Sequence, residues 1–168
     1  RDLVKVANNE ARPILQGAGA DELLSSGVER QISVIMGRDD RRASGVFFSG
    51  HEWAARLVAA LPDRPYSRYI DPACGIGDLL LAVARKSILQ ADVQSTIYSW
   101  RSMFVAMDID ASFASVAWNR LLALALQRHR FAASRQAARL NRRNPFLRAD
   151  ALELDWSLQA DDCVIMNP

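Results

Sequence analysis

The chain has 168 residues, of which 50% are hydrophobic and 24% are charged, a composition typical of one globular domain with a continuous core. Its formal net charge of +2 is too small to indicate a nucleic-acid partner by charge alone. It has no apolar run of about 20 residues, so a membrane span is not expected. Its two cysteines are too few for a disulfide framework or a zinc site, so a cytoplasmic location is expected.

Residues 1–43 form an N-terminal extension without a recognisable motif. Short helical pieces are expected over 1–36, interrupted at Pro13, Gly17, Gly19 and Gly27. The polar segment 37–45 is expected to be a loop. Because the sequence begins with Arg1 rather than Met, we expect it to be a piece of a longer protein.

A helix is predicted to follow this loop. Ser49-Gly50-His51-Glu52 fits a capping box, in which a serine is followed three residues later by a glutamate. Pro62 is expected to end the helix. Its apolar face is predicted to contain Ala54, Leu57, Val58 and Leu61.

Strand and helix patterns alternate from residue 68 onward. The predicted strands are 68–71, 103–107, 145–148 and 163–166, and the predicted helices are 78–89 and 111–128. The segment 72–77 is a glycine-containing turn, and 90–101 is expected to be a loop. This alternation predicts an α/β fold with a parallel sheet and helices on its faces.

The glycine turn Asp71–Gly77, DPACGIG, follows the first predicted strand, where open α/β sheets bind nucleotides. A dinucleotide-binding fingerprint would place a third glycine at Leu80. Asp71 and Asp78 bracket the turn, and two carboxylates repel a pyrophosphate but attract a ligand that carries an ammonium and a sulfonium. The residues therefore favour S-adenosylmethionine, with a turn that binds no ligand as the alternative.

DPACGIG resembles the first motif of the amino-methylating DNA methyltransferases, which are class I S-adenosylmethionine-dependent enzymes. The resemblance covers residues 44–168 and depends on five motifs in the family's order. It implies a Rossmann-like parallel sheet flanked by helices, truncated after the fourth strand because the family fold has more strands. It assigns cofactor contacts in and beside the turn to Asp71, Ala73, Cys74, Gly75, Gly77 and Asp78.

Two later strand ends resemble the family's other cofactor motifs. In AMDID, 106–110, the resemblance assigns the ribose hydroxyls to Asp108 and the adenine to Ile109, while Asp110 is expected to cap the next helix. In RADA, 148–151, it assigns the adenine amine to Asp150 and a ring contact to the Ala151 amide. About 30 positions separate the glycine turn from AMDID, more than the roughly 20 of a compact unit, and the excess is assigned to the loop 90–101.

The segment GVFFSG, 45–50, resembles the motif that precedes the glycine turn in family members whose cofactor motifs come first. There two aromatic residues are commonly followed by Thr-Pro, and Ser49 and Gly50 stand at those positions here. The resemblance implies that Phe47, Phe48 and Ser49 lie near the methionine end of the cofactor. The alternative is that both phenylalanines are ordinary core residues.

A hydrophobic strand followed by Asn167-Pro168 resembles the opening of the family's catalytic motif, Asn-Pro-Pro-Tyr. An exocyclic amine is a poor nucleophile because its lone pair is delocalised into the ring. The Asn167 oxygen and a prolyl carbonyl would accept the amine protons and aim that lone pair at the methyl group. An aromatic residue beyond Pro168 would stack on the flipped base. We therefore expect Asn167 and Pro168 to be catalytic, and the chain by itself to be catalytically incomplete and to bind cofactor weakly, if at all.

The resemblance implies methyl transfer to the exocyclic amine of a DNA base, adenine N6 first, in a bacterial restriction-modification or phage-defence setting. Double-stranded DNA would be bound largely by parts outside this chain, a specificity or restriction subunit is a further expected partner, and neither a membrane nor a metal is expected. The alternatives are RNA, protein glutamine or cytosine N4 as the substrate, a non-catalytic S-adenosylmethionine-binding module, and a dinucleotide oxidoreductase, which the carboxylates disfavour.

The most basic stretch, residues 128–143, has a composition found in nucleic-acid-binding segments. It follows a predicted helix and precedes a predicted strand, which places it at the amino-terminal edge of the sheet. The cofactor would lie at the carboxyl edge. We therefore interpret this stretch, including an exposed His129, as a solvated surface or a contact for other parts of the protein.

Overall fold

The computed structural model describes residues 23–25, 27–35, 49–130 and 144–167. Its strands are β1 (Arg68–Asp71), β2 (Phe104–Asp108), β3 (Leu147–Arg148) and β4 (Asp162–Val164). Its helices are α3 (Gly27–Ile35), α5 (His51–Ala59), α6 (Asp78–Lys86), α7 (Val93–Met103) and α8 (Ala111–Arg128), with a 3-10 turn at Ala151–Glu153. The predicted α/β class with a parallel, Rossmann-like sheet is confirmed.

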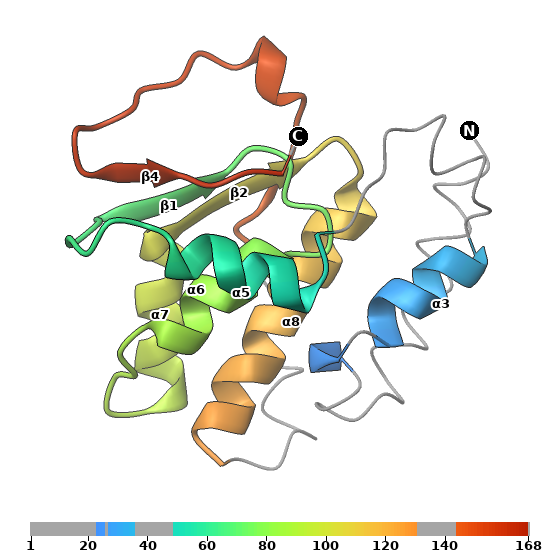
Figure 1. Ribbon diagram of the computed structural model, residues 1–168, viewed down its shortest axis with the longest axis horizontal. Coiled ribbons are helices and arrows are strands. Elements are labelled where there is room, and N and C mark those ends of the chain that lie inside the picture. The colour runs from blue at the N-terminus through green and yellow to red at the C-terminus, as the bar shows by residue number, and fades with distance from the viewer. Residues whose placement is uncertain (1–22, 26, 36–48, 131–143, 168) are drawn as a thin grey trace.

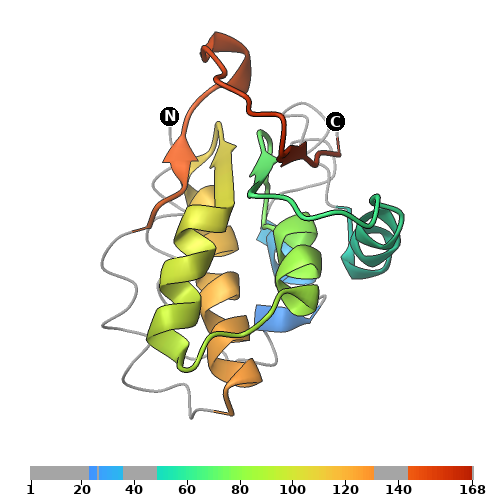
Figure 2. The same ribbon diagram turned by 90° about the vertical axis from the view of Figure 1, so that its left-hand side faces the viewer.

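All strands in the described part of the chain run parallel, in the order β3-β2-β1-β4 (Figure 2). The chain proceeds from β1 to β2 to β3 in one direction and then returns to the other side of β1 with β4. This reversal is a topological switch point, at which a crevice forms outside the carboxyl ends of β1 and β4. Residues 72–77 leave β1 and residues 165–167 leave β4 at this crevice.

Helices α5 to α8 lie together on one side of the sheet (Figure 1). The predicted parallel sheet flanked by helices is therefore observed, with the helices of the described part of the chain on this one side. Ile70 of β1 pairs in register with both Val105 and Val164, so the three side chains share a face. Ile70 is buried, but Val164 is 47% exposed. On the other face, Tyr69 pairs with Phe104 and Cys163, which are both buried, and Phe104 packs against Trp100 of α7. The sheet therefore buries the face that it turns toward the helices more completely.

The prediction of a loop over 90–101 is wrong, because most of that segment is helix α7. Asp92 caps the helix by accepting a hydrogen bond from the backbone N–H of Ser95 at 2.7 Å. The buried residues follow the helical spacing of every third or fourth position: Val93, Thr96, Ile97 and Trp100. This helix accounts for the extra length between the glycine turn and the end of β2.

The start of helix α5 also differs from the prediction. Gly50 is the N-cap, with a φ of 71°, and no side chain caps the helix. Ser49 therefore precedes the cap, and Glu52 is the second helical residue rather than the third, so neither occupies its capping-box position. On the predicted apolar face, Ala54 and Val58 are buried, whereas Leu57 is 38% exposed.

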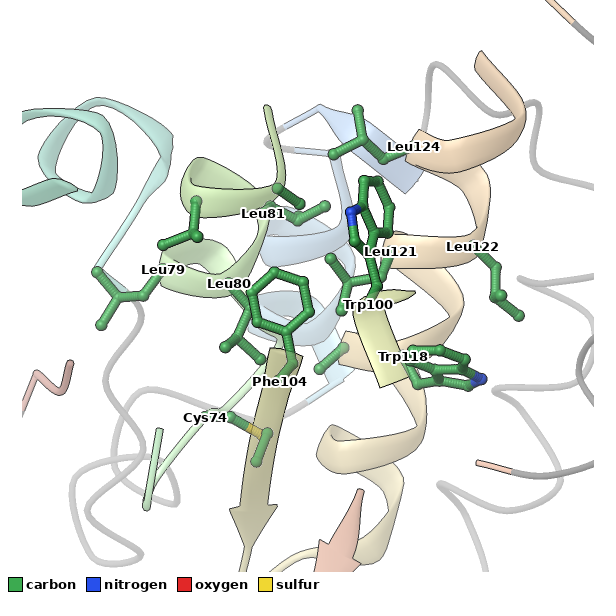
Figure 3. Packing of buried hydrophobic residues seen from close by; sticks show 14 of the residues in the cluster. Cys74, Leu79, Leu80, Leu81, Trp100, Phe104, Trp118, Leu121, Leu122 and Leu124 are labelled. Carbon is green, nitrogen blue, oxygen red and sulfur yellow. The ribbon is translucent and has the colours of Figure 1, made fainter. Parts of the chain in front are cut away.

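The hydrophobic core lies between the sheet and the helices. Figure 3 shows Leu80 of α6, Trp100 of α7, Phe104 of β2 and Leu121 of α8 gathered there, all of them at most 2% exposed. Burying each such side chain stabilises the fold by about 1.5–3 kcal/mol. Helix α8 has the predicted bounds and is buried on most of its surface, so it forms the centre of the helical layer.

The described part of the N-terminal extension belongs to the same core. Leu23, Leu24 and Val28 are between 3% and 8% exposed and join the main hydrophobic cluster. Helix α3 begins at Gly27, one of the predicted interruptions. The helical pieces expected before residue 23 and the whole of the predicted loop 37–45 lie outside the described residues. Of the helices in the described part, none combines the length and apolar character that crossing a membrane requires.

Candidate functional site

The glycine turn crosses the end of β2 before it enters α6. The backbone N–H of Cys74 donates to the Met107 carbonyl at 2.9 Å, which ties the turn to β2. The N–H of Gly77 donates to the Cys74 carbonyl at 2.8 Å and closes the loop. Gly75 has a φ of 49° and Gly77 a φ of 82°, both in the left-handed region that favours glycine. The turn is therefore held by backbone contacts of its own.

Gly77 is constrained a second time by helix packing. A Cβ atom at this position would lie 2.8 Å from Cβ of Ala117 on α8, closer than carbon atoms can approach without movement of one backbone. The start of α6 therefore lies directly against α8. This packing explains the glycine without a ligand, and it fixes the position of the turn relative to the ends of the strands.

Three segments that are far apart in the sequence meet at one shallow pocket beside this turn. The pocket is shallow, and its space of about 290 Å³ includes a part that is open to solvent. It is lined by Ser49, Asp71, Ala73, Cys74, Gly75, Ile76, Asp78, Leu79 and Asn167. The pocket therefore lies at the switch point and contains residues from three of the sequence-predicted motifs.

Asp71, at the end of β1, is a buried carboxylate of this pocket. It is 1% exposed and accepts a hydrogen bond from the backbone N–H of Ala73 at 3.3 Å. The pKa of Asp71 is raised to about 7, chiefly by burial; the bond from Ala73 opposes this rise and the negative charge of Asp108 contributes to it. Among the described residues, no cation forms an ion pair with Asp71. A cationic ligand would therefore stabilise the ionised form of this carboxyl.

Asp78 differs from Asp71 although both bracket the turn. Its Oδ1 lies 2.8 Å from Nη1 of Arg120, and both side chains are buried. Asp78 brackets the turn and lines the pocket, but because Arg120 neutralises it, the charge argument from two carboxylates depends on Asp71. Arg120 was not identified from the sequence. The feature that could have indicated it is a charged residue in the middle of a largely apolar helix, α8.

Asp108, at the end of β2, contacts the glycine turn directly. Its Oδ2 accepts from the backbone N–H of Gly75 at 2.8 Å, and its Oδ1 accepts from the N–H of Asp110 at 2.9 Å. Burial raises the pKa of Asp108, against the effect of these two hydrogen bonds. A carboxylate has about four acceptor positions, so two remain for a ligand. The structure thus connects two of the predicted cofactor motifs.

The residues that follow Asp108 separate into two roles. Ile109 is 68% exposed, and neither it nor Asp108 lines the pocket. Asp110 accepts a hydrogen bond from the N–H of Ser112 at 2.7 Å and caps α8, which confirms the prediction for this residue.

The end of β3 approaches the same edge of the sheet. The backbone N–H of Ala149 donates to the Asp108 carbonyl at 3.1 Å. Asp150 caps the following 3-10 turn by accepting from the N–H of Leu152 at 2.9 Å. Neither Asp150 nor Ala151 lines the pocket, so the structure places this motif beside Asp108 without bringing it to Asp71.

Asn167 reaches the pocket from the other side of the switch point. The backbone N–H of Ile165 donates to the Ile70 carbonyl at 2.9 Å, which extends the pairing of β4 with β1 past Val164. Two residues later, Asn167 is exposed to solvent and lines the pocket together with Asp71. Of the other predicted site residues, Phe47, Phe48 and Pro168 lie outside the described residues.

Cys74 has a packing role in the turn. It is 6% exposed, and burial raises the pKa of its thiol far above the ordinary value, with the charge of Asp71 adding to the shift. A thiol of this kind stays protonated at neutral pH and is a poor nucleophile. The described residues also contain no cluster of His, Cys, Asp or Glu side chains that would hold a metal.

The described start of the basic stretch lies at the opposite end of α8 from Asp110. Nη1 of Arg128 donates to the carbonyl oxygens of Ala84 and Ser87, at the end of α6. With 18 residues in α8, this end is roughly 25 Å from the Asp110 end of the helix. His129, predicted to be exposed, is half-buried and forms a 2.9 Å hydrogen bond with Oγ1 of Thr96. Residues 131–143 lie outside the described residues.

No family model, no curated protein and no solved structure matches the chain.

Proposed function

We propose that this chain is the S-adenosylmethionine-binding part of a class I methyltransferase that methylates the exocyclic amine of a DNA base, adenine N6 first. The observation that carries the proposal is the meeting of Asp71, the glycine turn and Asn167 at one pocket of the switch point. Asp71 and the glycine turn were predicted from one sequence motif, and Asn167 was predicted from another. The strand order places these two motifs at neighbouring strand ends, where one ligand could contact both.

The charge of the pocket supports the cofactor. S-adenosylmethionine carries an ammonium and a sulfonium, and Asp71 is a buried carboxylate without a cationic partner in the described residues. An anionic pyrophosphate at this position would be repelled by Asp71 and by Asp108 behind the turn. The ion pair between Asp78 and Arg120 does not change this argument, because Asp71 and Asp108 still place negative charge next to the turn.

The remaining contacts follow from the strand ends. The acceptor positions left on Asp108 suit the two hydroxyls of a ribose. The exposed Ile109 next to it suits the face of an adenine ring, and that contact would cover its apolar surface. Asp150 would complete the adenine site from the end of β3. Phe47, Phe48 and Ser49 are assigned to the methionine end, of which the pocket lining includes Ser49.

S-adenosylmethionine, when bound, supplies a methyl group on a sulfonium, which leaves as a thioether. The side-chain oxygen of Asn167 accepts a hydrogen bond from the target amine, and the carbonyl of Pro168 is assigned the second one. Both bonds draw electron density toward the nitrogen and favour its tetrahedral geometry, so they strengthen as the reaction proceeds. The proton that the amine loses passes to solvent. DNA as the substrate is proposed from the motif resemblance.

The affinity for S-adenosylmethionine is expected to rise at least tenfold between pH 5.5 and pH 7. Only ionised Asp71 pairs with the ligand ammonium, and its pKa of about 7 means that this form is lost as the pH falls. An α-amino group, with a pKa of about 8, stays charged throughout this interval. Calorimetric titrations at several pH values measure the change.

The Asp71→Asn variant is the test of the cause. It is expected to bind more weakly at pH 7 and to lose most of the pH dependence, whereas Asp63→Asn, which replaces an exposed carboxylate, should behave like the wild type. An affinity that stays constant from pH 5.5 to 7, or an unchanged affinity in Asp71→Asn, would exclude Asp71 as the partner of the ammonium.

A further inference from the structure

One buried guanidinium connects the N-terminal segment to the glycine turn. Nε of Arg120 donates to the Leu23 carbonyl at 2.8 Å. Its Nη1 donates to the Ile76 carbonyl at 2.7 Å and to Oδ1 of Asp78 at 2.8 Å. Arg120 itself is 3% exposed and does not line the pocket, whereas Ile76 and Asp78 do.

These bonds hold the turn on both sides of its most constrained residue. Ile76 precedes and Asp78 follows Gly77, whose φ of 82° has to be maintained for α6 to begin where it does. The planar guanidinium holds its donors in a fixed arrangement. Because Arg120 is buried in α8, its side chain has little freedom to move, so the turn keeps these hydrogen bonds only in one position. An ammonium at the same place would be a single point of charge with no such fork.

We propose that Arg120 is a positioning residue of the cofactor site, which holds the glycine turn through Ile76 and Asp78 and couples it to the N-terminal segment at Leu23. This inference rests on the proposed function for the identity of the ligand. The coupling is reciprocal: a docked N-terminal segment favours the binding-competent turn, and an occupied pocket stabilises the docked segment.

The chain offers matched controls for both ends of this connection. Nη2 of Arg85 donates to the carbonyl of Leu24, the neighbour of Leu23, at 3.2 Å, and among the described residues it has no hydrogen bond to the turn. Arg85→Lys therefore weakens the same segment without touching Ile76 or Asp78. Ile97 of α7 is a buried aliphatic residue like Leu23, so Ile97→Ala controls for a general loss of packing.

The experiment uses the protein as its gene encodes it, at a temperature where every variant is folded. Arg120→Lys and Leu23→Ala are expected to weaken S-adenosylmethionine affinity about tenfold and, without ligand, to speed hydrogen exchange of the amides of residues 75–79 at least tenfold. Arg85→Lys and Ile97→Ala should stay within about twofold of the wild type in both measurements. Equal effects of the two lysine variants on the turn would overturn the proposal.

A measurement on the wild type alone covers the case in which a variant does not fold. Saturating S-adenosylmethionine is expected to slow hydrogen exchange of the backbone amides of residues 23–25 and 27–29 by at least threefold. Unchanged exchange of these amides would overturn the coupling. If the wild type binds no S-adenosylmethionine, the proposed function fails. The positioning role is then still tested without ligand, by comparing hydrogen exchange of residues 75–79 in Leu23→Ala with that in Ile97→Ala. Equal exchange in the two variants would overturn it.

Discussion

Replacing Asn167 with alanine is expected to slow methyl transfer by two or more orders of magnitude while leaving the affinity for S-adenosylmethionine near that of the wild type. The side chain would contact the reacting amine, and its hydrogen bond would strengthen as the nitrogen becomes tetrahedral, so its loss falls on the chemical step. Removing one preorganised polar contact at a reacting centre typically costs about 100- to 1,000-fold in rate. The cofactor contacts are assigned to other strand ends and remain.

The rate is measured on unmethylated genomic DNA with the protein as its gene encodes it, and the methylated nucleosides are identified by mass spectrometry. Asn167→Asp should retain part of the activity, because it keeps an acceptor but adds a negative charge that stabilises the sulfonium before transfer. Met166→Ala, at the exposed neighbouring position, should transfer methyl groups at the wild-type rate. A wild-type rate in Asn167→Ala would contradict the amine-methylation mechanism. The identity of the methylated nucleoside shows whether the target is adenine N6 or cytosine N4.

Replacing Asp108 with alanine is expected to weaken S-adenosylmethionine binding at least tenfold. Each charged hydrogen bond to a ribose hydroxyl is worth about 1.5–3 kcal/mol, and tenfold corresponds to about 1.4 kcal/mol. The structure adds a second cause, because the backbone N–H groups of Gly75 and Asp110 lose their acceptor in this variant. The glycine turn would therefore also become less ordered.

The neighbouring carboxylate separates these effects from a loss of helix capping. Asp110→Ala removes the cap of α8, so it should lower the free energy of unfolding by about 1 kcal/mol and leave the cofactor affinity unchanged. Calorimetric titration and thermal unfolding of the two variants provide the comparison. An Asp108→Ala protein that binds like the wild type would remove Asp108 from the site.

Most elements of the fold could be predicted because their signals are local. The strand at Arg68–Asp71 and the helix at Ala111–Arg128 have the predicted bounds, and both combine an apolar pattern with an adjacent turn or cap. Helix α7 was missed although Asp92 and its buried face follow the same rules. There the expectation of a compact strand–helix–strand unit outweighed the local pattern. At Gly50, a positive φ shifted the helix start, which the capping-box sequence does not reveal.

The site was predictable only as far as topology determines it. A parallel sheet brings strand ends to one edge, so the convergence of Asp71 and Asn167 follows once the strand order is known. The partner of Asp78 did not follow, because Arg120 lies one helix away and pairing across packed helices leaves no short-range spacing. The hydrogen bond from the Gly75 N–H to Asp108 was not predictable either, because it joins two motifs that are about 30 residues apart in the sequence.

The central claim is that this pocket takes S-adenosylmethionine, and a calorimetric titration of the wild-type protein, in the form in which its gene encodes it, tests it most directly. Saturable binding of S-adenosylmethionine at pH 7 is expected. NAD, which would place a pyrophosphate beside Asp71, should bind at least tenfold more weakly. Tighter binding of NAD, or no binding of S-adenosylmethionine, would contradict the account.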